Sequence, residues 1–327
     1  MTARSALRVA VVVNPRSSAP RRLRAGALAA LRERSEVVGE LATQGDASDG
    51  ARLAQLLASA APDVLVAAGG DGTVGLALRA LLETRGAERP ALGFLPLGTG
   101  NNAARSFGLR ALRGAPSAAL DLALAALVCG PRRAVDVGLA GGRPFLGSFT
   151  LGMDADVLAL RNRLVRRLGR SRLARGYGLY AFSILVNLMR GARGTPARLW
   201  LDGERELRPL HNLAVINAPI YAGPLRLDGA NDCADGLLDV HATASAAQYL
   251  LEIPSAWRRH LRVQRGVNAA ASSLLRRARE VRVELDRPVA AQADGEEIGA
   301  AASFRVVVRP RAVRVCTPPS ARDQRGA

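Results

Sequence analysis

Five consecutive residues, Gly69-Gly70-Asp71-Gly72-Thr73, have the composition of a phosphate-binding turn. They follow the apolar run Val64–Ala68 and precede the apolar segment 74–82, which predicts a buried strand, a glycine turn and a helix. Backbone without Cβ atoms can approach a phosphate there and offer N–H groups at a helix N-terminus. Asp71 would carry an unfavourable charge in this anion cradle unless a divalent metal or a proton network shares it. An ordinary tight turn with Asp71 as a helix cap is the alternative that the spacing leaves open.

A second glycine-rich loop, Gly98-Thr99-Gly100-Asn101-Asn102-Ala103, follows the apolar run 91–97. It matches the dinucleotide fingerprint G-x-G-x-x-A in form, but that fingerprint belongs to the first strand–helix turn of its unit. This loop comes late in the predicted sheet. Two phosphate-type loops at the carboxyl ends of strands are more simply explained as two walls of one nucleotide site.

The composition narrows the possible chemistry. The chain has 46 basic residues, a formal charge of +18 and no lysine, so all of its basic residues are arginines. The lack of lysine excludes a Walker-A lysine, a Schiff-base lysine and the lysine-dependent protein-kinase site. The charge suggests an anionic partner, either nucleic acid or the cytoplasmic membrane leaflet, although a solvated arginine-rich surface explains it equally well. The few aromatic residues are not interleaved with arginines, so no specific nucleic-acid partner is expected.

Length and cysteine usage set the broad class. A chain of 327 residues favours two domains. Its cysteines, Cys129, Cys233 and Cys316, are scattered and lack metal-binding spacing, which indicates a reducing compartment. The start of the chain lacks the long apolar core of a signal peptide, so we expect a cytoplasmic protein.

The first part of the chain alternates strand and helix patterns. Strands are predicted at 7–13, 37–41, 64–68 and 91–97, and helices at 21–34, 51–60, 74–82 and 118–128. This alternation predicts a mainly parallel sheet whose ligands bind beyond the carboxyl ends of its strands. Asn14-Pro15 and Thr43 follow the first two strands, and therefore belong to that edge.

The pattern changes at Pro131, from which we expect a mostly antiparallel β domain. Strands are predicted at 133–139, 144–151, 197–201, 213–217, 237–242, 281–285, 289–293 and 304–308. Gly141-Gly142 and Asp202-Gly203 are hairpin signals. Two helices interrupt the strands, a basic amphipathic one at 157–175 and an apolar one at 177–189 that is too short to span a bilayer. They could lie on a membrane surface, or form an arginine-rich outer face over a core-facing stripe.

Four loops in this order resemble those of one family. Asn14-Pro15, Gly69–Thr73, Pro96-Leu97-Gly98-Thr99-Gly100-Asn101 and Asp294-Gly295-Glu296 resemble the loops of soluble bacterial diacylglycerol kinases and related lipid kinases. That family includes sphingosine kinases and is distantly related to NAD kinases. The resemblance runs from Val9 to about Pro318. The first glycine loop alone is shared with NAD kinases, but the set of four is specific.

The resemblance implies a fold and two ligands. It implies a Rossmann-like α/β nucleotide-binding domain over residues 1–130 and a β-sandwich-like lipid-substrate domain over 131–309. Residues 310–327 would return to the first domain, near 313–316, and form a tail. ATP would bind in the cleft between the domains, with Mg²⁺ as cofactor. The implied nucleotide contacts are Asn14, Thr43, Gly69, Gly70, Asp71, Gly72, Thr73, Val74, Gly75, Thr99 and Asn101.

The resemblance also implies catalytic and metal-binding roles. Asp294 would accept the proton of the lipid hydroxyl, with Glu296 beside it. Asp71 would join a magnesium–water network in which Asp136 is the second acidic member. A structural Mg²⁺ would be held by Asp232, Asp235 and the Leu237 main chain, a set of oxygen ligands that suits a hard cation.

Asp294-Gly295-Glu296 has an internal control in this sequence. The same tripeptide occurs at Asp202-Gly203-Glu204, in a predicted hairpin turn. The tripeptide alone is therefore a weak signal. Its position near the C-terminal return is what favours Asp294.

The chain departs from the family pattern in three places. Val74-Gly75-Leu76 replaces the usual continuation that carries an asparagine and a glutamate next to the nucleotide. Ser17-Ser18-Ala19 lacks the usual glycine, and Asp46-Ala47 stands where many members have His-Ala. The first departure bears on nucleotide affinity and activity more than on the fold.

The expected function is an ATP- and Mg²⁺-dependent lipid kinase that phosphorylates a hydroxyl of diacylglycerol or a related lipid. We expect it to associate peripherally with the anionic inner face of the cell membrane, and a homodimer is a candidate assembly. An NAD-kinase-like soluble kinase is one alternative. A non-catalytic binder of anionic membranes or nucleic acid is the other.

Overall fold

The computed structural model describes residues 6–84, 89–112, 116–168, 178–189, 194–220, 232–249 and 274–319. The chain forms two compact units. The α/β unit comprises the residues up to Val135 and those from Arg311 onward, and the β-rich unit comprises Asp136–Pro310.

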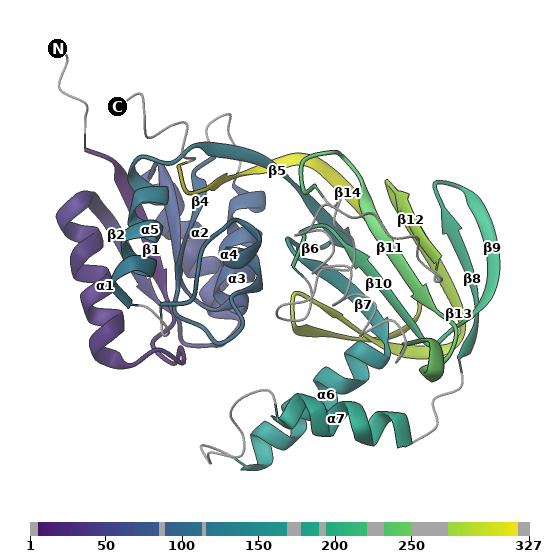
Figure 1. Cartoon of the computed structure of the whole chain (residues 1–327). Coiled ribbons are helices and arrows are strands. Elements are labelled where there is room, and N and C mark those ends of the chain that lie inside the picture. Colours follow the sequence, from purple (N-terminus) through teal and green to yellow (C-terminus); the bar gives the residue numbers. More distant parts are fainter. Residues whose placement is uncertain are drawn as a thin grey trace. The chain divides into compact units, whose positions relative to one another are not determined.

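The α/β unit is built on a parallel sheet in the order β2-β1-β3-β4 (Figure 1). Its strands are β1 Arg8–Val13, β2 Glu36–Ala42, β3 Val64–Gly69 and β4 Ala91–Pro96. All residues of β3 and β4 are buried, as expected for central strands that are covered on both faces. The end of the chain adds a further parallel strand, because Val315 of β14 pairs with Leu92 of β4. The predicted return of the C-terminal segment is thus confirmed.

Helices cover this sheet. They are α1 Arg21–Arg34, α2 Ser48–Ala60, α3 Asp71–Glu83, α4 Asn102–Ser106 and α5 Pro116–Val128. Helix α1 packs with α5, and α3 packs with both α2 and α4. Each helix buries an apolar stripe at helical spacing, such as Ala27, Leu28 and Leu31 of α1, which fixes its orientation on the sheet.

The β-rich unit contains an antiparallel sheet in the order β12-β11-β10-β7-β13-β14, with β8 and β9 continuing from β13, and β5 and β6 from β14. The strands are β5 Arg132–Ala140, β6 Arg143–Phe145, β7 Ser148–Gly152, β8 Thr195–Leu201, β9 Glu204–Leu210, β10 Asn212–Ile216, β11 Leu238–Thr243, β12 Leu274–Ala278, β13 Glu280–Ala293 and β14 Glu296–Cys316. The inward side chains form one core around Phe145, Phe149, Leu199, Leu213 and Val283. Alternation of buried and exposed residues, as along β8, sets which face of each strand enters this core.

Two helices belong to the β-rich unit, α6 Met153–Leu168 and α7 Gly178–Met189. Helix α6 packs on β7 and β13, and α7 packs on α6 (Figure 1). The expected basic helix extends to residue 175 in the sequence pattern, but residues 169–177 lie outside the described part of the chain.

The predicted fold class is confirmed, and several element boundaries differ from expectation. The single strand expected over 144–151 is two strands, β6 and β7. They are separated because the N–H groups of Leu146 and Gly147 donate to the carboxylate of Asp294 instead of to a neighbouring strand. The strands expected at 281–285 and 289–293 are parts of one strand, β13, whose register against β14 shifts between Glu284 and Val289.

Candidate active site

Four loops meet at one edge of the parallel sheet in the α/β unit. Val13 at the end of β1 pairs with Ala42 of β2 and Ala68 of β3, and Ala68 pairs with Leu95 of β4. Since all four strands run in the same direction, the residues that follow them lie at the same edge. This edge carries Asn14, Thr43, the Gly69–Thr73 loop and the Gly98–Asn101 loop.

The two glycine-rich loops touch each other through their backbones. The N–H groups of Leu97 and Gly98 donate to the carbonyl of Gly69 at 3.0 and 3.1 Å. A Cβ atom on Gly98 would lie 2.4 Å from the Cα of Gly70, and one on Gly69 would lie 2.1 Å from Thr73 Oγ1. Only glycine permits this approach. The predicted proximity of the two loops is confirmed.

Asn101 holds the second loop together. Its Oδ1 accepts the N–H of Gly98 at 2.9 Å, and its Nδ2 donates to the carbonyl of Gly98 at 2.8 Å. The residue is buried and has φ +51°, a left-handed conformation that asparagine tolerates better than most residues. Its amide side chain therefore shapes the loop, while the neighbouring Thr99 is exposed.

Asp71 lies between the starts of two helices. It is the first residue of α3, and its Oδ1 accepts the N–H of Ala103 in α4 at 3.1 Å. Burial raises the pKa of this carboxyl, an effect that backbone N–H groups of Ala103, Asn102 and Asn101 partly offset. A Cβ atom on Gly100 would lie 2.9 Å from Asp71 Oδ2, so that loop also needs glycine. The raised pKa agrees with the expectation that this position disfavours an isolated charge, and the role of Asp71 stays a prediction.

The first two strands end in turns held by side-chain contacts. Asn14 Oδ1 accepts the N–H of Arg16 at 2.8 Å, and the N–H of Asn14 donates to Ala68 of β3. The N–H of Thr43 donates to Val13, and the turn after it is held by Asp49, whose buried carboxylate accepts the N–H groups of Gln44 and Gly45. Asp49 was not among the site residues predicted from the sequence. An acidic residue at the start of a helix pattern was the available signal.

The start of α3 favours an anion at this edge of the sheet. The glycines at Gly69, Gly98 and Gly100 let the backbones of the two loops approach closely, because a Cβ atom there would collide with neighbouring protein atoms. Helix α3 begins beside them and directs the positive end of its dipole to this edge. Val74 and Gly75 are buried in the first turns of α3 and offer backbone rather than side-chain contacts. The nucleotide roles of the individual residues stay predictions.

In the β-rich unit, Asp294 and Gly295 form the turn between β13 and β14. Their φ values of +50° and +82° are those of a tight hairpin turn. The Asp294 carboxylate accepts the N–H groups of Leu146, Gly147 and Ser148 at 2.7, 2.8 and 2.9 Å. A carboxylate has about four lone-pair positions, so these three donors occupy most of its capacity.

Neighbouring contacts fix this turn further. Glu296 Oε2 pairs with Arg143 Nη2 at 2.6 Å, and both side chains are partly exposed. Gln292 accepts the N–H of Gly295 and donates to Thr150 Oγ1. The turn is thus a rigid site with two carboxylates, one held by backbone N–H groups and one by an arginine. The catalytic roles of Asp294 and Glu296 stay predictions.

The expected metal-binding loop lies beside Asp136. Asp136 is buried, its Oδ2 accepts the N–H of Gly236 at 2.7 Å, and its N–H donates to Cys233. The segment that contains Asp232, Asp235 and Leu237 is therefore a close neighbour of Asp136. Residues 230–231 of the same motif lie outside the described part of the chain.

The acidic side chains of this loop make local contacts. Asp232 and Asp235 accept N–H groups of Ala234 and Leu237, and Asp235 Oδ2 lies 3.4 Å from Arg277 Nη1. Among the described residues, no three histidine, cysteine, aspartate or glutamate side chains cluster as metal ligands. The predicted ligand set has only two such side chains and a main-chain carbonyl, so this finding does not bear on it. The assignment from sequence stays a prediction.

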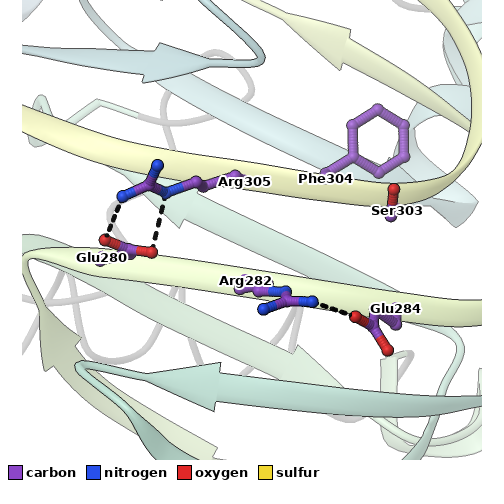
Figure 2. A pocket seen from close by; sticks show the side chains of 6 residues that line it. All are labelled: Glu280, Arg282, Glu284, Ser303, Phe304 and Arg305. Atoms are coloured by element: carbon purple, nitrogen blue, oxygen red, sulfur yellow. Dashed lines mark hydrogen bonds and ion pairs between the residues drawn. The ribbon is translucent and has the colours of Figure 1, made fainter.

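A concavity of about 440 Å³ lies on β13 and β14, lined by Glu280, Arg282, Glu284, Ser303, Phe304 and Arg305 (Figure 2). Figure 2 shows that its charged side chains pair with one another: Arg305 binds both carboxylate oxygens of Glu280, and Arg282 binds Glu284. These mutual pairs leave little charge to recognise a substrate, so this hollow is not a candidate active site.

No helix in the described part of the chain is both long and apolar enough to span a membrane.

Comparisons with known proteins cover both units. Residues 8–140 match the family model described as the diacylglycerol kinase catalytic domain, and residues 147–317 match the YegS C-terminal NAD kinase beta sandwich-like domain. A diacylglycerol kinase of Mycobacterium tuberculosis is 34% identical over 71% of this chain and 72% of its own length. A probable YegS-like lipid kinase of Pseudomonas aeruginosa is 30% identical over 95% of this chain and 94% of its own.

The fold has solved counterparts. The crystal structure of a diacylglycerol kinase from Bacillus anthracis superimposes with a TM-score of 0.68 at 20% sequence identity, covering 97% of this chain and 99% of that one. At this identity the similarity concerns the fold. The order of the two matched domains in the chain is that of the two units described above.

Proposed function

The chain belongs to the diacylglycerol kinase family of lipid kinases, and on that premise we propose that it transfers the γ-phosphoryl group of ATP to a hydroxyl of diacylglycerol or a closely related lipid. The enzyme is a phosphotransferase with an alcohol acceptor. In the proposed reaction the lipid oxygen forms a bond to the γ-phosphorus, the bond from that phosphorus to the bridging oxygen of ADP breaks, and the hydroxyl proton is lost. Mg²⁺ would arrive with ATP as part of the substrate.

The observation that carries this proposal is the backbone cradle around Asp71. Two glycine loops in direct contact lie at the start of α3, where the positive end of the helix dipole favours an anion without any lysine. A partly buried carboxyl whose pKa is raised by desolvation supports a partner that arrives with positive charge, as a nucleotide-bound Mg²⁺ would.

On the acceptor side we propose Asp294 as the group that orients the lipid hydroxyl and takes its proton. Three backbone N–H groups hold its carboxylate in one position, which is the preorganisation that a hydroxyl-positioning base requires. The Arg143–Glu296 pair would keep the adjacent strand end in place.

The absence of the family's asparagine and glutamate after Thr73 fits a nucleotide contact made by the main chain. Val74 and Gly75 are buried within α3, where the Val74 side chain contributes packing and Gly75 has no side chain to offer a ligand. We propose that this chain binds the phosphates chiefly through backbone N–H groups of the two loops.

The decisive experiment measures phosphoryl transfer. Purified protein, labelled ATP, Mg²⁺ and vesicles that contain diacylglycerol should yield a labelled lipid phosphate, identified by mass spectrometry. Asp71→Asn should lower product formation by about 100-fold or more, whereas Asp202→Asn, in the other Asp-Gly-Glu turn, should retain it. Failure of the wild-type protein to phosphorylate any of several lipid alcohols would contradict the proposal.

The same assay separates the alternatives. Formation of NADP from NAD and ATP without a lipid product would identify a soluble NAD-type kinase. Vesicle or DNA binding without ATP turnover would identify a non-catalytic binder. The enzyme is proposed to work at the anionic inner face of the cell membrane, where its substrate lies.

A further inference from the structure

In helix α7 two polar side chains are buried and two large apolar side chains are exposed to solvent. Ser183 and Asn187 are buried, at 0% and 8% exposure, and Leu179 continues this stripe. Phe182 and Leu185 are 51% and 55% exposed. They are the only large apolar side chains in the described part of the chain that are exposed. A surface helix normally shows the reverse arrangement.

The buried polar groups of α7 are satisfied within the helix. Ser183 Oγ donates to the carbonyl of Leu179 and Asn187 Nδ2 donates to the carbonyl of Ser183, each at 2.8 Å. The inward stripe therefore needs no water, and it faces α6, the helix on which α7 packs. Phe182 and Leu185 project from the other side of α7, three residues apart and therefore on one face.

The chain around α7 is strongly basic. From Val157 to Leu201 the sequence has no aspartate or glutamate. Over the same stretch it has arginines at Arg161, Arg163, Arg166, Arg167, Arg170, Arg172, Arg175, Arg190, Arg193 and Arg198. Helix α7 itself carries no charged residue. Arg163, Arg166 and Arg167 of α6 have exposed side chains, so positive charge is presented by the helix that supports α7.

We propose that α6 and α7 together form a membrane-docking element, in which Phe182 and Leu185 insert at the acyl-chain boundary of an anionic bilayer while Arg163, Arg166 and Arg167 meet lipid phosphates. A helix of this length is too short to span the bilayer and lies in its surface. Exposed apolar side chains beside clustered arginines match such an interface, since the bilayer supplies both an apolar layer and negative charge. The proposal rests on the proposed function for its biological role, but its evidence is the polarity of α7 and the charge around it.

The test is vesicle co-sedimentation of the full chain, with phosphatidylcholine vesicles and with phosphatidylcholine–phosphatidylglycerol vesicles. Wild type should bind the anionic vesicles, and binding should fall as salt is added. Phe182→Ser/Leu185→Ser should weaken the partition coefficient by about tenfold or more, because two apolar side chains no longer leave water. Arg163→Gln/Arg166→Gln/Arg167→Gln should weaken binding to the anionic vesicles and flatten its salt dependence.

A matched charge variant gives the control. Arg276→Gln/Arg279→Gln/Arg309→Gln removes the same charge from exposed positions elsewhere in the β-rich unit. It should bind nearly as wild type does. Equal loss in both triple variants would show that net charge alone drives binding, and would overturn the docking element.

A second measurement tests insertion without removing an apolar side chain. The tryptophan fluorescence of Phe182→Trp should be quenched by brominated acyl chains when anionic vesicles are added. A bound variant whose fluorescence is not quenched would contradict insertion. The alternative partner of this face is a second copy of the chain, and light scattering tests it by measuring the molar mass in solution. If wild type is a dimer that Phe182→Ser/Leu185→Ser converts to a monomer, this face is a self-interface and the proposal is wrong.

These measurements do not depend on phosphoryl transfer. A protein that docks but transfers no phosphate overturns the proposed function alone. A protein that phosphorylates vesicle-borne diacylglycerol equally well with and without Phe182 and Leu185 overturns the docking element alone.

Discussion

Asp294 and Asp202 occupy equivalent positions in the two Asp-Gly-Glu hairpins of the β-rich unit. Each has φ +50°, and each carboxylate accepts backbone N–H groups from a neighbouring segment. They differ in how the oxygens are used. Asp202 accepts Arg279 and Glu280 on the same oxygen, Oδ1, whereas Asp294 accepts on both oxygens.

This difference predicts unequal effects of the same substitution. Asp202→Asn keeps an oxygen for both N–H groups and should change the free energy of unfolding by less than about 0.5 kcal/mol. Asp294→Asn places an NH₂ group against a backbone donor and should reduce that free energy by about 1–3 kcal/mol. Urea unfolding of both variants measures these changes in the free energy of unfolding. Equal stability of the two variants would mean that the carboxylate of Asp294 does not hold the turn in solution. In that case, a loss of activity in Asp294→Asn would report on the chemical step alone, because the fold would be unaffected.

The burial of Asp71 predicts a pH-dependent stability difference. The raised pKa means that the folded protein binds this proton more tightly than the unfolded chain does. The carboxylate therefore destabilises the ligand-free fold only above the unfolded-state pKa, about 3.9, and the effect grows as pH rises through the folded-state pKa. Asp71→Asn should raise the melting temperature at pH 7 but not near pH 4.

The same variant should lose activity. Removing a positioned charge at the phosphate cradle should lower the rate of phosphoryl transfer by about 100-fold or more. The combination of higher stability and lower activity is the expected signature of a charge kept for function. An Asp71→Asn variant with a lower melting temperature at neutral pH would show that its contacts with α4 outweigh the desolvation of the carboxylate.

The contact of the two glycine loops can be tested with one methyl group. In Gly98→Ala the added Cβ would meet the Cα of Gly70 at 2.4 Å, and backbone cannot move aside as a flexible side chain can. The free energy of unfolding should fall by about 1–3 kcal/mol, and binding of a fluorescent ATP analogue should weaken. Gly26→Ala is the control, since its Cβ would meet nothing within 4 Å in the middle of α1.

Gly26→Ala should instead stabilise the protein by about 0.5–1 kcal/mol, because alanine restricts the unfolded chain and favours a helix. Nucleotide binding should not change in this variant. If Gly98→Ala binds the analogue as tightly as wild type does, the loop contact is not needed for the nucleotide site.

Sequence alone was sufficient for features that local pattern determines. Helix α1 runs from Arg21 to Arg34 as predicted, because apolar residues at helical spacing follow Pro20, which favours a helix start. Convergence of the two glycine loops was also predictable, since parallel strands bring their carboxyl ends to one edge.

Other features were set by distant partners. Strand β9 has a polar sequence and is extended because every residue pairs with β8. The amides of Leu146, Gly147 and Ser148 bind a carboxylate far along the chain, and Asp49 binds the turn before its own helix. No periodicity marks such contacts, because a single residue makes each of them.

Cys316 reports on the strand that returns to the α/β unit. It follows Val315, which pairs with Leu92, and burial raises the pKa of its thiol to about 11 although Arg132 and Arg314 act in the opposite direction. At pH 8 the thiolate fraction in the folded protein is then about one part in a thousand, and the sulfur is also shielded. Exposed Cys129 should react with an aromatic disulfide reagent at once, and Cys316 only when the strand leaves the sheet.

A variant that retains one cysteine makes this quantitative. In Cys129→Ser/Cys233→Ser the remaining thiol should react slowly in native protein and rapidly in guanidinium, with a native rate that rises with denaturant in parallel with global unfolding. Such a dependence means that the returning strand is part of the cooperative core of the α/β unit. Rapid labelling without loss of the circular dichroism signal would mean that the returning strand detaches from β4 while the rest of the protein stays folded. Nucleotide binding should then slow the labelling, because the nucleotide favours the state in which the strand is paired.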